Sequence, residues 1–281
     1  MKKLLAIILL LGLAAGLFAC GEKEEAETTS TAPTESTAAY AAQYPYTYKA
    51  GGFTIRYYVE NGMAFVDYAG EWLPDDGTDN AFIVPVTIDG MPVRWALDAD
   101  DDAVALRKLQ DCGELIVPAG IKAVSMDLSN AETVRLGPDV ERFEIGRGYV
   151  NRIEVDRENE RLRSIDGVLF NKDGTVLLQY PTGRPWASYE IPDGTVAIAA
   201  GALWFSRPVE LKNVEIPDSV TSFPDSLDDL INTYGYQLTF IVKDGSAAES
   251  YFKRQTINES FRRAKEETGE DPFLLRTQGR G

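Results

Sequence analysis

The sequence predicts a mainly β protein, built as a solenoid of short stacked repeats with a β-hairpin cap at its N-terminal end and a helix at its C-terminal end. Short apolar segments recur in the middle of the chain, with equivalent residues 19 to 36 positions apart. Turn-forming residues separate these segments, so each one is the length of a strand. Units this small cannot bury their own apolar faces, and we therefore expect them to stack into one continuous core.

The N-terminus has the three-part pattern of a secretory signal. Lys2 and Lys3 precede an apolar run from Leu4 to Leu17, and the small Ala19 stands directly before Cys20. Residues 17–20 resemble the lipobox of bacterial lipoproteins, in which cleavage before the cysteine is followed by acylation. The resemblance implies that Cys20 is lipidated, that residues 1–19 are removed, and that the protein is extracytoplasmic, held on the bacterial membrane or cell surface by its lipid alone. The alternative is an ordinary secretory signal that contains a cysteine.

Charge and composition exclude several classes of function. The chain carries a formal charge of −16, and removal of residues 1–19 takes two lysines and leaves −18. Such a surface repels nucleic acid and anionic lipid head groups. The chain has no histidine, which excludes Ser-His-Asp and Cys-His catalysis and histidine-ligated metals. Cys112 has no disulfide partner once Cys20 is acylated, and we expect it to be a buried structural thiol.

The segment after the signal is predicted to be a tether, followed by the cap. Residues 20–45 are rich in Glu, Thr, Ala and Ser, and they bury too little apolar surface to offset the entropy of ordering. Residues 46–78 form the predicted cap, because Phe53–Val59 and Ala64–Tyr68 are rich in aromatic and β-branched residues. Asn61-Gly62 between them favours a tight hairpin turn.

The solenoid is predicted over residues 79–245. Its repeats are recognised from strand triplets whose outer residues are mostly apolar, with third residues 19, 19, 36, 25 and 25 positions apart. The triplets are Leu115-Ile116-Val117, Val134-Arg135-Leu136, Ile153-Glu154-Val155, Tyr189-Glu190-Ile191, Val214-Glu215-Ile216 and Thr239-Phe240-Ile241. Further columns recur four positions later (Ile121, Val140, Thr195, Val220) and seven positions later (Val124, Phe143, Ile198, Phe223). Proline directly after three of the triplets ends the strand.

Two other elements complete the prediction. The 36-residue interval contains apolar segments at 165–170 and 176–178 around a glycine-bearing turn at 171–174, which predicts an inserted hairpin. Residues 246–281 form the predicted C-terminal helix and tail. Ser246 is the expected N-cap of a helix running to about Thr268, with Gly269 as its stop.

Several strings in the repeat region resemble the BspA-like leucine-rich repeats of bacterial surface proteins, and the resemblance covers roughly residues 50–256. The strings are Ile191-Pro192-Asp193-Gly194, Ile216-Pro217-Asp218-Ser219-Val220, the insertion from Ile165 to Gly174, and the closing segment from Val242 to Glu249. The resemblance implies a curved, strand-dominated surface solenoid, of a kind often associated with adhesion. The family's Ala-Phe and Cys-x-x-Leu segment is eroded here, and only fragments such as Ala202-Leu203 and Leu211 survive.

The middle position of each triplet is the candidate interaction face. Parallel stacking would present Arg135, Glu154, Glu190 and Glu215 from one sheet face at steps of about 4.8 Å. One interpretation is a solvated face whose repulsion is screened by water and salt. The other is a docking strip for a basic partner surface or a cation.

Metal and cofactor chemistry is not expected. Asp98, Asp100, Asp101 and Asp102 begin like a calcium loop, but Ala103 replaces the glycine of such a loop and Leu109 replaces its glutamate. We therefore predict no metal site and no cofactor.

The leading prediction is a surface protein-interaction or adhesion module without catalysis, whose partner is a host, matrix or envelope protein. One alternative is a carbohydrate-binding or envelope-associated accessory module, in which a glycan stacks on Trp72, Trp95, Trp186 and Trp204. The other is a hydrolase that uses paired carboxylates, which the 44 acidic residues leave open.

Overall fold

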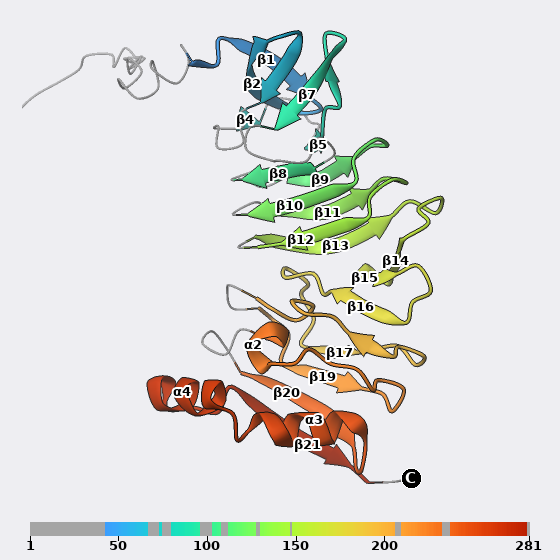
Figure 1. The fold of residues 1–281 in the computed structure, drawn as a ribbon, viewed down its shortest axis with the longest axis vertical. Helices are drawn as coiled ribbons and strands as arrows, with labels where there is room; N and C mark the ends of the chain where they lie inside the picture. Colours follow the sequence, from blue (N-terminus) through green and yellow to red (C-terminus); the bar gives the residue numbers. More distant parts are fainter. Residues whose placement is uncertain are drawn as a thin grey trace, which may run out of the picture.

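The computed structural model describes residues 43–66, 73–74, 80–95, 103–107, 112–127, 130–146, 148–205, 209–231 and 237–279. Cys20, Trp72 and the acidic residues at 98–102 lie outside these ranges, as does the side chain of Trp95. The described part is an elongated stack of β-sheets, with a mostly antiparallel sheet at its N-terminal end and helices at its C-terminal end (Figure 1). No described helix is long and apolar enough to cross a membrane.

The N-terminal sheet contains the predicted hairpin. Its strands are β1 (Tyr46–Ala50), β2 (Phe53–Glu60), β3 (Met63–Val66), β4 (Leu73–Pro74), β6 (Thr87–Ile88) and β7 (Met91–Trp95). β2 and β3 pair antiparallel, and Asn61 and Gly62 have φ values of 50° and 76°, so the predicted turn is confirmed. β7 pairs parallel with β3, so this sheet continues past residue 78.

The repeats that follow build two parallel sheets. One consists of β5 (Ala81–Ile83), β9 (Cys112–Val117), β11 (Asn130–Leu136) and β13 (Tyr149–Val155), in the order β13-β11-β9-β5. The other consists of β8 (Ala103–Arg107), β10 (Ala123–Asp127) and β12 (Arg142–Ile145), in the order β12-β10-β8. Val134 pairs with both Leu115 and Ile153, which confirms the predicted register of the first three triplets.

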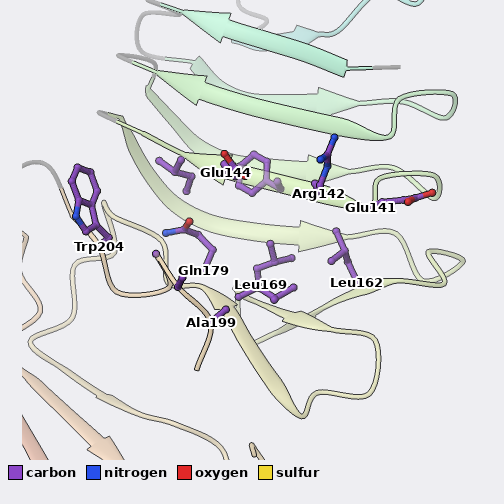
Figure 2. Close-up of a pocket in the computed structure, with 13 residues that line it drawn as sticks. Glu141, Arg142, Glu144, Leu162, Leu169, Gln179, Ala199 and Trp204 are labelled. Atoms are coloured by element: carbon purple, nitrogen blue, oxygen red, sulfur yellow. The ribbon is translucent and has the colours of Figure 1, made fainter. Parts of the chain in front are cut away.

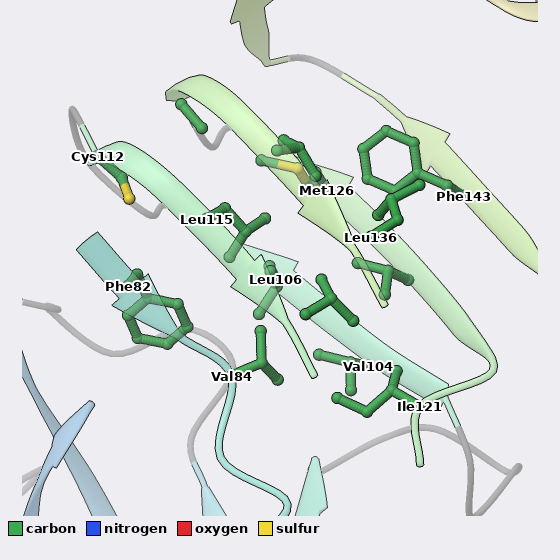
Figure 3. Close-up of a cluster of buried hydrophobic side chains, with 14 of the residues drawn as sticks. Phe82, Val84, Val104, Leu106, Cys112, Leu115, Ile121, Met126, Leu136 and Phe143 are labelled. Atoms are coloured by element: carbon green, nitrogen blue, oxygen red, sulfur yellow. The ribbon is translucent and has the colours of Figure 1, made fainter. Parts of the chain in front are cut away.

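The second strand of each repeat is a finding beyond the sequence prediction. The column seven positions after the first two triplets forms this strand, because Val124 of β10 pairs with Phe143 of β12. Both sheets direct apolar side chains into the space between them (Figure 3). Cys112 is among these side chains and is buried, as predicted.

A mixed sheet follows, formed by β14 (Leu162–Ile165), β15 (Val168–Asn171), β16 (Val176–Gln179) and β18 (Ala197–Ile198). β15 and β16 are the predicted hairpin. The first predicted segment is divided, however, because Asp166 and Gly167 have φ values of 51° and 79° and form a second tight turn between β14 and β15.

The mixed sheet separates two apolar clusters, where we expected one continuous core. Leu162 and Leu169 belong to the cluster of the N-terminal half, whereas Val168 and Phe170 belong to the cluster of the C-terminal half. β15 is therefore buried on both of its faces. Successive side chains of a strand point to opposite faces, so this one strand packs against both clusters.

The last sheet has the order β17-β19-β20-β21, and all its strands are parallel. They are β17 (Ser188–Glu190), β19 (Asn213–Ile216), β20 (Leu238–Lys243) and β21 (Phe273–Gln278). The predicted register of the final triplet is wrong by one residue, since Val214 pairs with Phe240 and Glu215 with Ile241. Three consecutive residues of β20 are buried, so the sequence of this strand does not alternate between apolar and polar residues and does not reveal its register.

The C-terminal helix is divided in two. α3 (Ala247–Gln255) begins after Ser246, whose hydroxyl accepts a hydrogen bond from the Glu249 amide at 3.1 Å, so the predicted N-cap is confirmed. α4 (Glu259–Thr268) ends at Gly269, which has φ 76°. Beyond it, the segment expected to be a tail forms β21 and extends the sheet. A short helix, α2 (Leu227–Leu230), lies between β19 and β20.

Candidate interaction face

The predicted middle column is divided between two sheets. Arg135 and Glu154 are neighbours on β11 and β13, and Glu190 and Glu215 are neighbours on β17 and β19. The mixed sheet of β14–β18 intervenes between these pairs along the stack (Figure 1). The four side chains therefore do not form the single strip that the sequence predicts.

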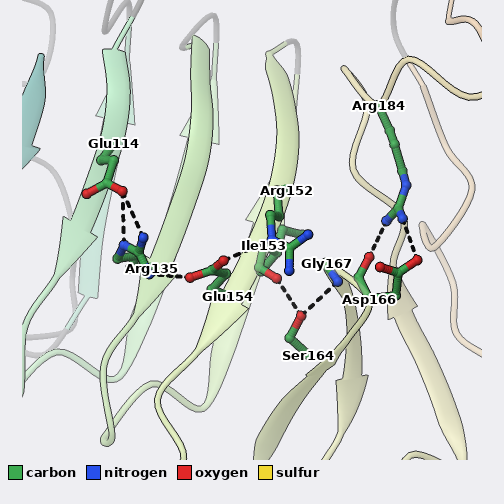
Figure 4. Close-up of polar contacts among 9 residues, drawn as sticks. All are labelled: Glu114, Arg135, Arg152, Ile153, Glu154, Ser164, Asp166, Gly167 and Arg184. Atoms are coloured by element: carbon green, nitrogen blue, oxygen red, sulfur yellow. Dashed lines mark hydrogen bonds and ion pairs between the residues drawn. The ribbon is translucent and has the colours of Figure 1, made fainter.

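The N-terminal half of the column is neutralised by its own ion pairs (Figure 4). Arg135 Nη2 lies 2.8 Å from Glu114 Oε1, and Arg135 Nη1 also contacts Glu154 Oε2. Arg152 Nε donates to Glu154 Oε1 at 2.9 Å. The hydrogen bond from Arg135 lowers the pKa of the Glu114 carboxyl and in turn raises the pKa of Arg135. This part of the face offers a balanced set of charges.

The C-terminal half of the column lies in a strongly acidic hollow. We call it the acidic hollow and define it by the charged residues Glu190, Asp193, Glu215, Asp218 and Lys243, which line a volume of about 450 Å³ together with neighbouring apolar and polar residues. Asp218 is paired with Lys243 at 2.6 Å. Three carboxylates remain without a cationic partner among the residues that the structure describes.

Local structure explains why these carboxylates gather. Glu190 and Glu215 are paired across the parallel strands β17 and β19, with Glu190 exposed and Glu215 half-buried. Glu215 accepts a hydrogen bond from Gln278 Nε2 at 3.3 Å, which ties β19 to the last strand of the sheet. Asp193 and Asp218 occupy the turns that follow, each directly after a proline that ends its strand.

Sequence reasoning identified Glu190 and Glu215 but missed Asp193 and Asp218. The signal was present, because both aspartates stand at the same place in the aligned strings Ile191-Pro192-Asp193 and Ile216-Pro217-Asp218. Repeats that stack in register bring equivalent turn residues together as well as equivalent strand residues.

An equivalent hollow lies at the ends of β9, β11 and β13. It has a volume of about 350 Å³ and is lined by Pro118, Pro138, Arg135, Glu154 and Asp156 among others. Here the guanidinium of Arg135 pairs with Glu154, so the charged lining carries a formal charge of −1, against −3 in the acidic hollow. The two hollows therefore share a shape that derives from the repeat, and they differ in charge.

The acidic hollow does not have the geometry of a metal site. Among the described residues, no group of three or more Cys, Asp or Glu side chains converges closely enough to hold a metal ion. Its carboxylates are spread over two strands and two turns instead. This spacing suits contact with several separate basic side chains.

The described tryptophans lie apart from this hollow. Trp186 is 46% exposed, and one face of its ring is covered by the Arg184 guanidinium, 3.6 Å from the ring centroid. Arg184 is itself held by Asp166 at 2.7 Å (Figure 4). Trp204 lines a separate groove beside β12. These two tryptophans therefore occupy different surroundings.

No family model matches the chain, and no curated protein matches it significantly. Among solved structures, a leucine-rich repeat protein from Eubacterium ventriosum is 16% identical, aligns over 72% of this chain and 74% of that protein, and has a TM-score of 0.32. A leucine rich cell surface protein from Faecalibacterium prausnitzii is 13% identical over 65% and 73%, with a TM-score of 0.27. The pneumococcal vaccine antigen PcpA is 12% identical over 84% and 99%, with a TM-score of 0.21.

Proposed function

We propose that this protein is a lipid-anchored, extracytoplasmic leucine-rich-repeat solenoid that serves as a protein-interaction or adhesion module, without catalysis. The acidic hollow is the observation that carries the proposal. Glu190, Asp193 and Glu215 lack cationic partners in the described structure, whereas in the equivalent recess of the N-terminal half Arg135 pairs with Glu154. We assign the hollow to a partner protein with a basic surface.

The physical argument is electrostatic complementarity. Like charges on adjacent strands destabilise a sheet, so Glu190 opposite Glu215 costs folding free energy when the protein is alone. Lysine or arginine side chains of a partner would remove that cost and gain charge-assisted hydrogen bonds. Because the carboxylates face solvent, the attraction acts mainly on the association rate and weakens as salt rises.

The test is a pull-down with the full-length protein, offered to host-matrix proteins and to the organism's own envelope fraction and analysed by mass spectrometry. The informative variant is Glu190→Lys with Glu215→Lys. The matched control is Glu266→Lys with Glu267→Lys, because both control residues are exposed on α4 and the change in net charge is identical. We expect a saturable basic partner that the control retains and the hollow variant loses.

The proposal fails if both double variants retain the partner equally, or if the captured proteins are acidic. Capture of glycans in place of protein would move the function to the carbohydrate-binding alternative. Folding of each variant is verified by its far-ultraviolet circular dichroism, so that loss of binding is not loss of structure.

A further inference from the structure

β12 ends its sheet with a free edge. Within the described part of the chain it pairs only with β10. The amides of Arg142 and Gly146 donate to Lys122 O and Met126 O on the β10 side, at 3.1 and 2.6 Å. Main-chain groups alternate in direction along a strand, so the N–H and C=O groups of Phe143 and Ile145 point away from β10.

The neighbouring edge, on β13, is covered by the chain itself. The Val150 amide donates to Thr182 Oγ1 at 3.1 Å, and the Gly183 amide donates to Val150 O at 2.8 Å. Ile153 O accepts from Ser164 Oγ at 2.6 Å, and the Ile153 amide donates to Gly167 O at 2.9 Å. Proteins commonly protect sheet edges in this way, because unpaired edges invite other strands. Among the described residues, the chain therefore covers one of two adjacent edges and leaves the other open.

The open edge lies over an apolar groove of about 340 Å³ (Figure 2). Leu162, Leu169 and Leu178 of the mixed sheet line it together with Ala199, and Trp204 stands at one end. The groove exists because the sheet of β8, β10 and β12 stops where the inserted hairpin begins. A strand added to β12 would place alternate side chains over this apolar lining.

The rim of the groove carries the carboxylates of Glu141 and Glu144 and the guanidinium of Arg142, so its formal charge is −1. Glu141 and Glu144 are exposed, and neither forms an ion pair with another described residue. Glu144 projects from the outer face of β12, between the buried Phe143 and Ile145. The outward-facing residues of an added strand would lie beside Glu144, where basic side chains are favoured.

We propose that the free edge of β12 binds an extended peptide segment of a partner protein by strand addition, with apolar side chains in the groove alternating with basic side chains on the rim. Main-chain hydrogen bonds to Phe143 and Ile145 supply affinity, and the alternation supplies specificity. This site is separate from the acidic hollow and goes beyond the proposed function. Substitutions at one site should therefore weaken binding at that site and leave binding at the other unchanged.

The test uses the full-length protein and a labelled acetyl-(Val-Lys)₄-amide peptide, with binding measured by fluorescence anisotropy. A block peptide of four valines followed by four lysines has the same charge without the alternation. An analogue N-methylated at every valine and lysine keeps every side chain but loses all its main-chain donors, whichever way the peptide runs. We expect each control to bind about tenfold more weakly or worse than the alternating peptide. Amide hydrogen exchange should slow at Phe143 and Ile145 when the alternating peptide is bound.

Substitutions distinguish binding at this groove from nonspecific attraction of a basic peptide to the acidic protein. Ala199→Phe fills the groove and should weaken binding of the alternating peptide about tenfold. Glu144→Gln should weaken it about threefold, as loss of one cross-strand charge pair. Glu190→Lys with Glu215→Lys should match the charge-matched control Glu266→Lys with Glu267→Lys to within about twofold. Circular dichroism melts confirm that each variant is folded.

Equal affinity for the alternating and block peptides would overturn the proposal, as would tight binding of the N-methylated analogue. Absence of binding at about 1 mM peptide would do the same. If the protein alone self-associates and Ala199→Phe abolishes that association, the edge belongs to a second copy of the chain, and the assignment to a partner peptide is wrong.

Discussion

Asn159 links two successive repeats through one side chain. It is fully buried, and its Nδ2 donates to Gly137 O and Val140 O at 2.9 and 2.8 Å. Its Oδ1 accepts from the amides of Arg161 and Leu162 at 2.9 and 2.7 Å. All of its polar atoms are thus satisfied, which is the condition for a buried amide to stabilise a fold.

We therefore predict that Asn159→Ala lowers the free energy of unfolding by about 2–4 kcal/mol, because it leaves several buried main-chain groups without a hydrogen-bond partner. Urea unfolding measures the change. The neighbouring exposed Glu158→Ala is the control and should stay within about 0.5 kcal/mol of the parent protein. Equal stabilities of the two variants would show that these hydrogen bonds contribute nothing.

Tyr180 gives a second prediction at the residue scale. Its hydroxyl is buried without a hydrogen-bond partner in the described structure, and burial raises its pKa from 10.0 to about 12. Above pH 10 the unfolded chain releases a proton that the folded chain retains, so stability is fully present below pH 10 and is lost as pH rises toward 12. Tyr180→Phe removes this contribution.

The variant should be as stable as the parent protein at pH 7, or more stable by up to about 1 kcal/mol. Between pH 10 and 11 it should lose stability less steeply. It retains some dependence on pH, because burial also raises the pKa of Tyr251 to about 12. Urea midpoints at both pH values test this. A clear loss of stability at pH 7 would mean that the hydroxyl is bonded to an ordered water instead.

Sequence reasoning at this scale was right about Glu190 and Glu215 as neighbours and wrong about their continuity with Arg135 and Glu154. The inserted hairpin was recognised as an insertion within one repeat. In the structure the hairpin belongs to a sheet of its own, and this sheet separates Arg135 and Glu154 from Glu190 and Glu215. Its formation depends on which strands hydrogen-bond to one another, and no local sequence pattern encodes that.

At the scale of elements, the strand triplets were predictable because one face of each strand is buried. β11 shows this pattern, with Val134 and Leu136 inward and Arg135 outward. The final register was not predictable from alternation, because in β20 Leu238, Thr239 and Phe240 are all buried. α3 packs against this strand, with Phe240 and Phe252 stacked at 4.2 Å between ring centroids.

β21 was missed because it lies beyond an acidic, glycine-bearing segment and alternates only briefly. The structure shows why it forms. Phe273 is buried against Phe240, Phe252 and Phe261, with ring centroids 5.9, 5.2 and 5.4 Å away. The strand thus covers the edge of β20 that would otherwise be open.

We predict that Phe273→Ala lowers the free energy of unfolding by about 3–5 kcal/mol, since it removes an aromatic ring from a packed cluster. Leu274→Ala is the matched control, because the adjacent side chain points to the opposite face and is 40% exposed. It should change stability by about 0.5 kcal/mol or less. Thermal unfolding of both variants decides the matter. Equal melting temperatures would mean that β21 is not an integral strand.

At the scale of the whole molecule, β15 connects the two apolar clusters. Leu169 packs into the N-terminal cluster and Phe170 into the C-terminal cluster, although they are adjacent in the chain. Unfolding of either cluster would expose one face of this strand. We therefore expect the halves to unfold together rather than one after the other.

Phe170→Ala should consequently weaken both halves. Native-state hydrogen exchange would report this as faster exchange at Leu115 in the first cluster and at Val242 in the second. Phe252→Ala, which lies within the second cluster far from β15 in sequence, should also speed exchange at Leu115 if the halves unfold together. If Phe170→Ala leaves exchange at Leu115 unchanged, the halves are independent.

We propose that a basic partner protein contacts the acidic hollow. The most direct test of this proposal is amide hydrogen exchange of the full-length protein with and without the partner recovered by pull-down. We expect slower exchange at residues 188–193 and 213–218, with little change in β9, β11 and β13, where Arg135 already pairs with Glu114 and Glu154. Protection confined to those three strands, with residues 188–193 and 213–218 unchanged, would contradict it.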